Sequence, residues 1–177
     1  MTPTHRHAIV LVMVALGASL LVACSADPRA GYSSASAWPD QYQSVAVPML
    51  GNRTFARELD AQLTEAIVKE IQATTPYKVT GQGTADTILR GTITEVKLQE
   101  ISKSLVTGLG EEVAVKVTID YEWMDLRTGK PIVARNGFTG TAVFIPSRPT
   151  QEPLELAGFE VVQQLAREIV DSMQGEW

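Results

Sequence analysis

The residue types used most often in nucleophilic catalysis and zinc binding occur only at the start of this sequence. Both histidines, His5 and His7, and the single cysteine, Cys24, lie within the first 24 of its 177 residues. If that segment is removed, the rest of the chain holds no imidazole. Ser–His or Cys–His catalysis, histidine-rich zinc sites and disulfides within the folded part are then excluded. We expect no metal and no bound cofactor.

Two carboxylates form the best remaining arrangement for catalysis. Asp120 and Glu122 are two residues apart in a segment with strand periodicity, so they share one face. Such neighbours are about 7 Å apart, between the separations that retaining and inverting glycosidases require. Because surface acids are common on a polar strand face, we interpret the pair as solvent-exposed and predict that the chain is not an enzyme.

The first 23 residues have the three parts of a signal peptide. Residues 1–7 are polar and basic, residues 8–20 are almost wholly apolar, and small residues follow before Cys24. The apolar stretch 8–23 is short for crossing a hydrocarbon core of roughly 30 Å, which takes about 20 helical residues. We therefore predict an export signal over residues 1–23 rather than a permanent membrane span.

The end of this signal, Leu21-Val22-Ala23-Cys24, resembles the lipobox of bacterial lipoproteins. The resemblance implies that Cys24 becomes the lipidated first residue of the mature chain, whereas the alternative is an unmodified cysteine. Acyl chains on Cys24 would anchor the protein on a membrane, since each buried methylene contributes about 0.8 kcal/mol. Ser25 rather than aspartate follows, which in such lipoproteins implies the outer membrane, with the inner membrane as the alternative.

Charge and composition limit what the mature chain can bind. Without residues 1–23 the formal charge falls from −5 to −6, because Arg6 is lost. An acidic balance argues against nucleic acid, since a surface that follows phosphates needs clustered Lys and Arg. Residues 24–43, rich in Ser, Ala, Gly and Pro, are typical of a flexible tether behind the lipidated cysteine.

The pattern of residues 44–74 predicts a strand and then an amphipathic helix. Residues 44–50 form a short apolar run rich in β-branched side chains, with Pro48 at an edge position or at the end, and Gly51-Asn52 is a turn. Apolar residues then recur at helical spacing over residues 56–74, with Thr54 placed to cap the helix.

The rest of the chain predicts further strands and a second helix. Residues 77–80 and 87–102 are strands, the second with a bulge near Glu95, where its apolar face changes. Residues 112–125 alternate most regularly, and residues 132–145 return as the antiparallel partner. The second helical stripe carries Leu154, Val161, Val162, Leu165, Ile169 and Met173.

These elements predict an α+β fold, a two-layer α/β sandwich over residues 44–177. Two helices pack on one face of a mostly antiparallel or mixed sheet of four to five strands. The other face carries the polar side of strand 112–125, with Lys116, Thr118, Asp120 and Glu122. An exposed sheet face and edge suit a docking protein.

Five short motifs lie between residues 31 and 93. They are Gly31-Tyr32, Ser44-Val45-Ala46-Val47-Pro48, Asn52-Arg53-Thr54-Phe55, Leu63-Thr64-Glu65-Ala66 and Ala85-Asp86-Thr87-Ile88-Leu89-Arg90-Gly91. Together they resemble the lipopolysaccharide-assembly lipoprotein family, LptE. The resemblance implies a non-enzymatic, periplasm-facing lipoprotein of the outer membrane that docks with an LptD-like β-barrel translocon and contacts lipopolysaccharide.

A second interpretation keeps the binding role and changes the partner. Activators of peptidoglycan synthases are envelope lipoproteins whose domains also begin with a Val-Ala-Val-type strand and a helix. Residues 24–43 span at most roughly 70 Å when extended. Reaching through the cell wall usually takes a longer tether, so docking at the membrane is favoured.

Basic residues on the predicted strands, or beside their loop, are the candidates for contact with lipopolysaccharide. Lipid A phosphates favour Lys and Arg, and Arg can engage two oxygens at once. The candidates are Arg90, Lys97, Lys103, Lys116 and Arg135. Solvated surface charge is the alternative for each. In the apolar loop 104–110, Leu105, Val106 and Leu109 either insert into a barrel lumen or acyl chains, or fold back on the sheet.

Overall fold

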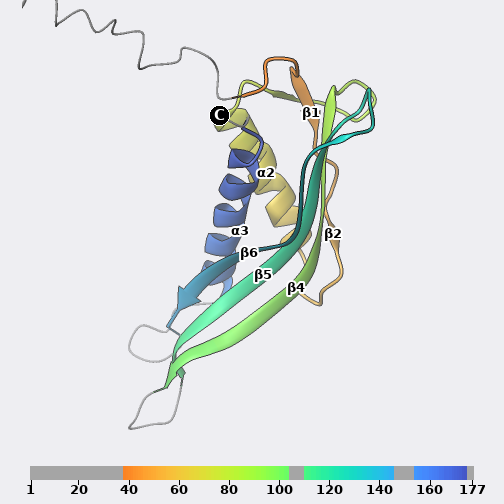
Figure 1. Cartoon of the computed structure of the whole chain (residues 1–177). Coiled ribbons are helices and arrows are strands. Elements are labelled where there is room, and N and C mark those ends of the chain that lie inside the picture. Colours follow the sequence, from red (N-terminus) through yellow and green to blue (C-terminus); the bar gives the residue numbers. More distant parts are fainter. Residues whose placement is uncertain (1–37, 104–109, 146–153, 175–177) are drawn as a thin grey trace, which may run out of the picture. The chain divides into compact units, whose positions relative to one another are not determined.

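The computed structural model describes residues 38–103, 110–145 and 154–174, without the side chains of residues 103, 110 and 111 (Figure 1). The predicted signal peptide, the predicted lipidation site Cys24 and most of the predicted tether lie outside these ranges. So do the predicted docking residues Leu105, Val106 and Leu109.

The described part contains six strands and two helices in one sheet-and-helix unit. Their bounds are β1 (Ser44–Ala46), β2 (Gly51–Asn52), α2 (Leu59–Thr74), β3 (Lys78–Val79), β4 (Thr87–Lys103), β5 (Gly110–Asp125), β6 (Pro131–Phe144) and α3 (Leu154–Asp171). The strand order is β3-β1-β4-β5-β6, and β2 also pairs with β4. Strands β1, β2 and β3 pair in parallel, whereas β4, β5 and β6 are antiparallel.

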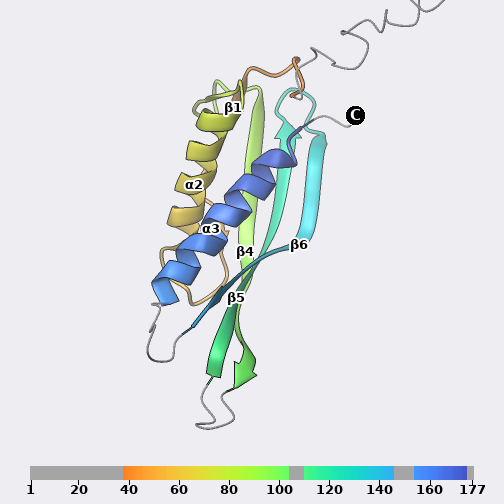
Figure 2. The ribbon, with the colours of Figure 1, turned by 90° about the vertical axis from the view of Figure 1, so that its left-hand side faces the viewer.

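Both helices lie on the same face of the sheet (Figures 1 and 2). The helix residues buried against it recur at helical spacing and include Leu63, Ile67, Ile71, Val161, Leu165 and Ile169. From β5, the alternate residues Val115, Val117, Ile119, Tyr121 and Trp123 are buried in the same core. Full burial of such a side chain contributes about 1.5–3 kcal/mol. The predicted α+β two-layer sandwich is confirmed.

Strand β4 changes its inward face at a bulge, as the sequence predicts. Ile93 pairs with Ile119 on the helix side, and the register then shifts so that Glu95 pairs with Thr118. One extra residue in β4 reverses which of its side chains face the helices. Between this bulge and the next register shift, after Glu100, the odd-numbered residues of β4 therefore face away from the core.

Two expectations for the segment before α2 are wrong. Gly51-Asn52 is not a turn but the short strand β2, which pairs with residues 92 and 93 of β4. Thr54 does not cap the helix, because α2 begins after Glu58, whose φ of 67° is left-handed and whose side chain makes no capping bond. The Thr54 hydroxyl bonds instead to Asn52, since Thr and Asn side chains compete for nearby partners in such turns.

Gly140 in β6 leaves room for α3. A methyl group added at this position would lie 2.7 Å from Cγ of Leu165, a fully buried side chain. Because the leucine branch point cannot move without repacking the core, we expect Gly140→Ala to lower the free energy of unfolding by about 1–3 kcal/mol. Chemical denaturation measures the difference. The control is Gly158→Ala in α3, where nothing lies within 4 Å, and equal destabilisation by both would contradict this explanation.

Candidate functional site

The open face of the sheet carries three of the five basic residues predicted to contact lipopolysaccharide. Cross-strand pairing places Arg90 opposite Glu122, and Lys97 opposite Lys116, on β4 and β5. Directly paired residues of antiparallel strands project to the same side. The intervening residues of β5 are buried against the helices, so these four side chains project from the opposite, open face.

Lys97 and Lys116 are like charges directly opposite each other, an arrangement that destabilises a sheet. Nζ of Lys97 lies 2.6 Å from Oε1 of Glu95, which offsets one of the two charges. With the described residues, Lys116 forms no ion pair. The pair therefore keeps an excess positive charge, and an anion bound between the two ammonium groups would relieve their repulsion.

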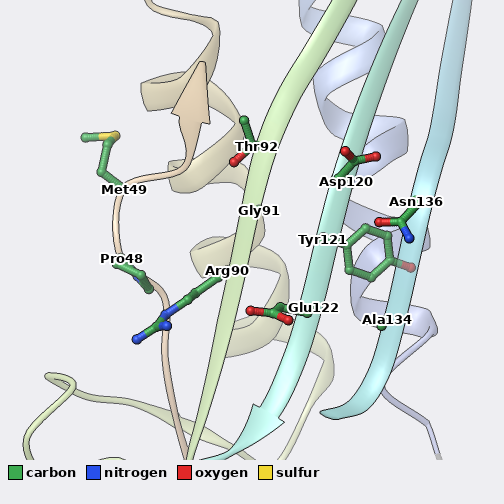
Figure 3. A pocket seen from close by; sticks show the side chains of 10 residues that line it. All are labelled: Pro48, Met49, Arg90, Gly91, Thr92, Asp120, Tyr121, Glu122, Ala134 and Asn136. Carbon is green, nitrogen blue, oxygen red and sulfur yellow. The ribbon is translucent and has the colours of Figure 1, made fainter. Parts of the chain in front are cut away.

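A trough of about 560 Å³ lies on the same face (Figure 3). Residues of the β1–β2 connection and of three strands line it: Pro48, Met49, Arg90, Gly91, Thr92, Asp120, Tyr121, Glu122, Ala134 and Asn136. Although Arg90 and Glu122 are cross-strand partners, they form no ion pair with each other or with any other described residue. The trough therefore presents one cation, Arg90, and two carboxylates, Asp120 and Glu122, to a partner.

Asp120, one of the two carboxylates considered for catalysis, has a structural contact. Its Oδ1 accepts a hydrogen bond of 2.7 Å from the backbone N–H of Gly137, whose φ of 67° is left-handed. The register between β5 and β6 shifts next to this contact, between Ile119 and Tyr121. Asp120 therefore fixes an irregular step in β6.

Of the other predicted contacts, only Arg135 has a described side chain, and it does not lie on this face. Arg135 is exposed on β6 but pairs with Tyr121, whose side chain is buried in the core. Its register therefore separates it from the three basic residues of the open face. Strand β4 ends at Lys103, whose side chain is outside the described part of the chain, as are the loop residues Leu105, Val106 and Leu109.

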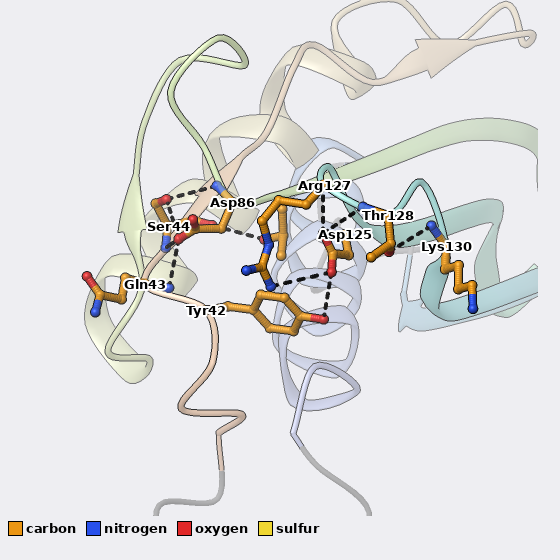
Figure 4. Close-up of polar contacts among 9 residues, drawn as sticks. Tyr42, Gln43, Ser44, Asp86, Asp125, Arg127, Thr128 and Lys130 are labelled. Carbon is orange, nitrogen blue, oxygen red and sulfur yellow. Dashed lines mark hydrogen bonds and ion pairs between the residues drawn. The ribbon is translucent and has the colours of Figure 1, made fainter.

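A polar clasp, which the sequence patterns did not predict, holds the segment that enters the domain (Figure 4). Oδ2 of Asp86 accepts hydrogen bonds from the backbone N–H of Gln43 at 3.0 Å and of Ser44 at 3.1 Å, and from the Ser44 hydroxyl at 2.9 Å. The Asp86 N–H donates back to Oγ of Ser44 at 3.0 Å. The only signal in the sequence was that both residues belong to the short motifs.

Asp125 forms the other half of the clasp. Its carboxylate accepts hydrogen bonds from the Tyr42 hydroxyl at 3.4 Å and from the backbone N–H groups of Arg127 and Thr128 at 2.7 and 3.3 Å. Burial would raise the pKa of Asp125, but these N–H groups and the Arg127 guanidinium, 3.7 Å away, hold it below its ordinary value. The turn after β5 is thus joined to the entering segment.

The clasp makes stability depend on pH through Asp86. The N–H of Gln43, together with the Ser44 hydroxyl, lowers the pKa of Asp86. A lowered pKa means that the ionised carboxylate stabilises the fold above the ordinary pKa of about 4, and that this contribution is lost as pH falls through the lowered value. We expect Asp86→Asn to lower Tm at pH 7, and the difference from wild type to shrink toward about pH 2.

Thermal unfolding followed by circular dichroism across this pH range checks the prediction. Asp40→Asn is the control, since Asp40 is an exposed carboxylate in the same segment. A Tm difference for Asp86→Asn that stayed constant at every pH would contradict the role of the ionised carboxylate.

Metal clusters and membrane-spanning helices are both absent from the described ranges. Residues 38–103, 110–145 and 154–174 hold no group of three or more His, Cys, Asp or Glu side chains placed to bind a metal ion. Neither helix in these ranges has the length and apolar character needed to cross a membrane.

The sequence model of the LptE family, described as lipopolysaccharide-assembly, matches residues 42–173. The chain belongs to the LptE family. The match reaches well beyond the motifs of residues 31–93 and includes both helices and all the strands. The family consists of non-enzymatic outer-membrane lipoproteins of lipopolysaccharide assembly. Membership therefore favours this role over activation of a peptidoglycan synthase.

Solved structures share this LptE fold at low sequence identity. Protein XCC0632 from Xanthomonas campestris is 13% identical, with a TM-score of 0.59 over 79% of this chain and 88% of that one. PelC from Paraburkholderia phytofirmans, solved as a dodecamer, is 18% identical, with a TM-score of 0.51 over 81% and 96%. Lipoprotein B from Nitrosomonas europaea is 13% identical, with a TM-score of 0.50 over 78% and 88%. These similarities show the fold alone, and no curated protein matches the sequence significantly.

Proposed function

We propose that this LptE-family protein is a lipid-anchored, non-enzymatic subunit that docks with an LptD-like β-barrel translocon. In this role it contacts lipopolysaccharide and assists its transfer to the outer membrane surface. Acyl chains on Cys24 hold the domain at the periplasmic side of the membrane. Membership of the family supports the general role in lipopolysaccharide assembly, and the lipid anchor, the barrel and the direct contact are the proposed refinements.

The Lys97–Lys116 pair is the observation that supports direct contact. Two ammonium groups on directly paired positions of β4 and β5 face the open side. Of the two lysines, only Lys97 has an ion-pair partner among the described residues, and that partner is Glu95. The phosphates of lipid A provide the anionic oxygens that such a pair would bind. Arg90 on the same face adds a guanidinium able to engage a phosphate through two oxygens.

Affinity purification of the full-length protein from detergent-solubilised envelopes tests docking. We expect one large β-barrel protein to co-purify in stoichiometric amount and to be identified by mass spectrometry. Cys24→Ala is the matched control for the anchor, and we expect it to leave the membrane fraction because it cannot be acylated. Recovery of a peptidoglycan synthase without a barrel would contradict the proposal and favour the alternative role.

A further inference from the structure

Phe55 is the most exposed large apolar side chain of the described part, with an exposed fraction of 104%. It lies in the connection between β2 and α2, within the Asn52-Arg53-Thr54-Phe55 motif. A phenylalanine ring left in water forgoes about 1.5–3 kcal/mol of burial. Single exposed apolar residues are common on proteins, so exposure alone does not indicate a binding role for Phe55. The structure of the loop that carries it is the further evidence.

The loop that carries Phe55, residues 52–56, is held in one conformation by its own side chains. Oδ1 of Asn52 accepts hydrogen bonds of 2.8 Å from both the N–H and the hydroxyl of Thr54. Nδ2 of Asn52 donates to the Ala56 carbonyl at 2.7 Å, and the Ala56 N–H donates to Oγ1 of Thr54 at 3.2 Å. These hydrogen bonds join residues that precede and follow Phe55 in the sequence. The ring is thus presented on a preformed loop, which lowers the entropy cost of binding.

The loop is also fixed to the sheet and flanked by cations. The Arg53 N–H donates to the carbonyl of Ile93 in β4 at 2.9 Å. The side chains of Arg53 and Arg57, on either side of Phe55, are exposed and form no ion pair with any described residue. Beside the ring, a hollow of about 310 Å³ lies between the loop and β4 and is lined partly by Val96.

We infer that this loop is a docking element, which inserts Phe55 into an apolar pocket on a protein partner. Aromatic and Arg side chains are the types enriched at the energetic centres of protein interfaces. We expect carboxylates at the rim of the partner's pocket, where they would pair with the two arginines. We also expect one side chain of the partner to occupy the hollow beside β4. The inference rests on the proposed function, and the partner is the β-barrel of that proposal.

A protein pocket fits these observations better than an anionic lipid surface. Membrane binding by a peripheral segment scales with the apolar area that it buries, and this loop offers a single ring. The whole chain is acidic, with a formal charge of −5, so an anionic membrane attracts only the two local arginines. A rigid loop with one protruding ring matches a shaped pocket, in which one residue can carry much of the binding energy.

The test measures the Kd of the full-length, lipidated protein for the LptD-like barrel of the same organism, purified in detergent. We expect Phe55→Ala to weaken binding by about tenfold or more. The matched control is Phe159→Ala, since Phe159 is another exposed phenylalanine, on α3, and we expect it to change Kd by less than about twofold. Neither variant is expected to lower Tm, because both rings are largely in solvent.

A second variant tests the loop rather than the ring. Thr54→Val keeps Phe55 but removes the hydroxyl that bonds to Asn52 and accepts from the Ala56 N–H. If a preformed loop matters, we expect a loss of affinity that lies between those of the control and of Phe55→Ala. An affinity equal to that of wild type would show that the rigidity of the loop is irrelevant and overturn this part of the inference.

Three outcomes separate this inference from the proposed function. Absence of binding by the wild type would overturn the proposed function, and the docking inference with it. Binding by the wild type with no effect of Phe55→Ala would overturn the docking inference alone. If Phe55→Ala weakened binding to vesicles of anionic phospholipid and left binding to the barrel unchanged, the loop would be assigned to a lipid surface. That result would also overturn the docking inference.

Discussion

Replacing Trp123 by alanine is expected to lower the free energy of unfolding by about 3–5 kcal/mol, the largest effect of a single change in this domain. The side chain is 1% exposed. The rings of Tyr42 and Tyr77 pack against its indole, with centroid distances of 5.6 and 5.9 Å. The alanine variant leaves a cavity beneath the entering segment that the clasp holds. Urea denaturation followed by circular dichroism measures the loss.

Trp123→Phe separates the packing of the ring from hydrogen bonding. Nε1 of Trp123 is buried and has no hydrogen-bond partner in the described part of the structure. Phenylalanine removes this unpaired donor and keeps most of the aromatic contact, so we expect a loss less than half that of alanine. An equal loss for the two variants would contradict ring packing as the source of stability.

Replacing both lysines of the Lys97–Lys116 pair by glutamine is expected to have the second large effect. We expect the affinity for lipopolysaccharide to fall roughly tenfold, because two cationic contacts to phosphate oxygens are lost. We expect the stability of the fold not to fall, with Tm unchanged or higher, because a like-charge pair is removed from the sheet. Binding to immobilised lipopolysaccharide and thermal unfolding are measured on the same samples.

The matched control for the pair changes two other lysines. Lys78, in β3, and Lys130, between β5 and β6, are both exposed, and neither pairs with Lys97 or Lys116. Their double replacement by glutamine changes the net charge by the same amount, so any long-range electrostatic effect is equal in the two variants. If the control lost as much affinity as the Lys97/Lys116 variant, net charge rather than a local site would explain the binding.

The fold was predictable where one periodicity extends over many residues. In β5 the alternation from Val113 to Trp123 placed one set of side chains in the core, and the change of face in β4 located the bulge near Glu95. Long strands and helices bury a whole face, so a single residue out of pattern has little effect on the prediction.

The short segments were less predictable because their structure depends on distant partners. Gly51-Asn52 has the composition of a turn, yet it forms a strand because β4 offers it a pairing edge. Pro48 limits β1 to Ser44–Ala46, since a residue without a backbone N–H cannot extend the pairing. The Asp86 clasp joins positions 42 residues apart, and no local pattern marks such a contact.

The candidate site was predictable in residue type and partly in position. Counting basic residues on strands identified Arg90, Lys97 and Lys116, which the register brings to one face. The same count also selected Arg135, which does not lie on that face. An irregular step in β6, held by Asp120, turns the Arg135 side chain to the other side of the sheet. Periodicity alone cannot predict this step, since it depends on a bond between two strands.

Depletion of the protein in its own bacterium tests whether lipopolysaccharide needs it to reach the cell surface. Newly made lipopolysaccharide is labelled, and its arrival at the cell surface is followed after expression of the chromosomal gene is stopped. We expect that arrival ceases, that the wild-type gene restores it, and that the Lys97/Lys116 glutamine variant restores it only in part. Undiminished arrival of lipopolysaccharide at the surface of fully depleted cells would contradict a role of this protein in lipopolysaccharide assembly.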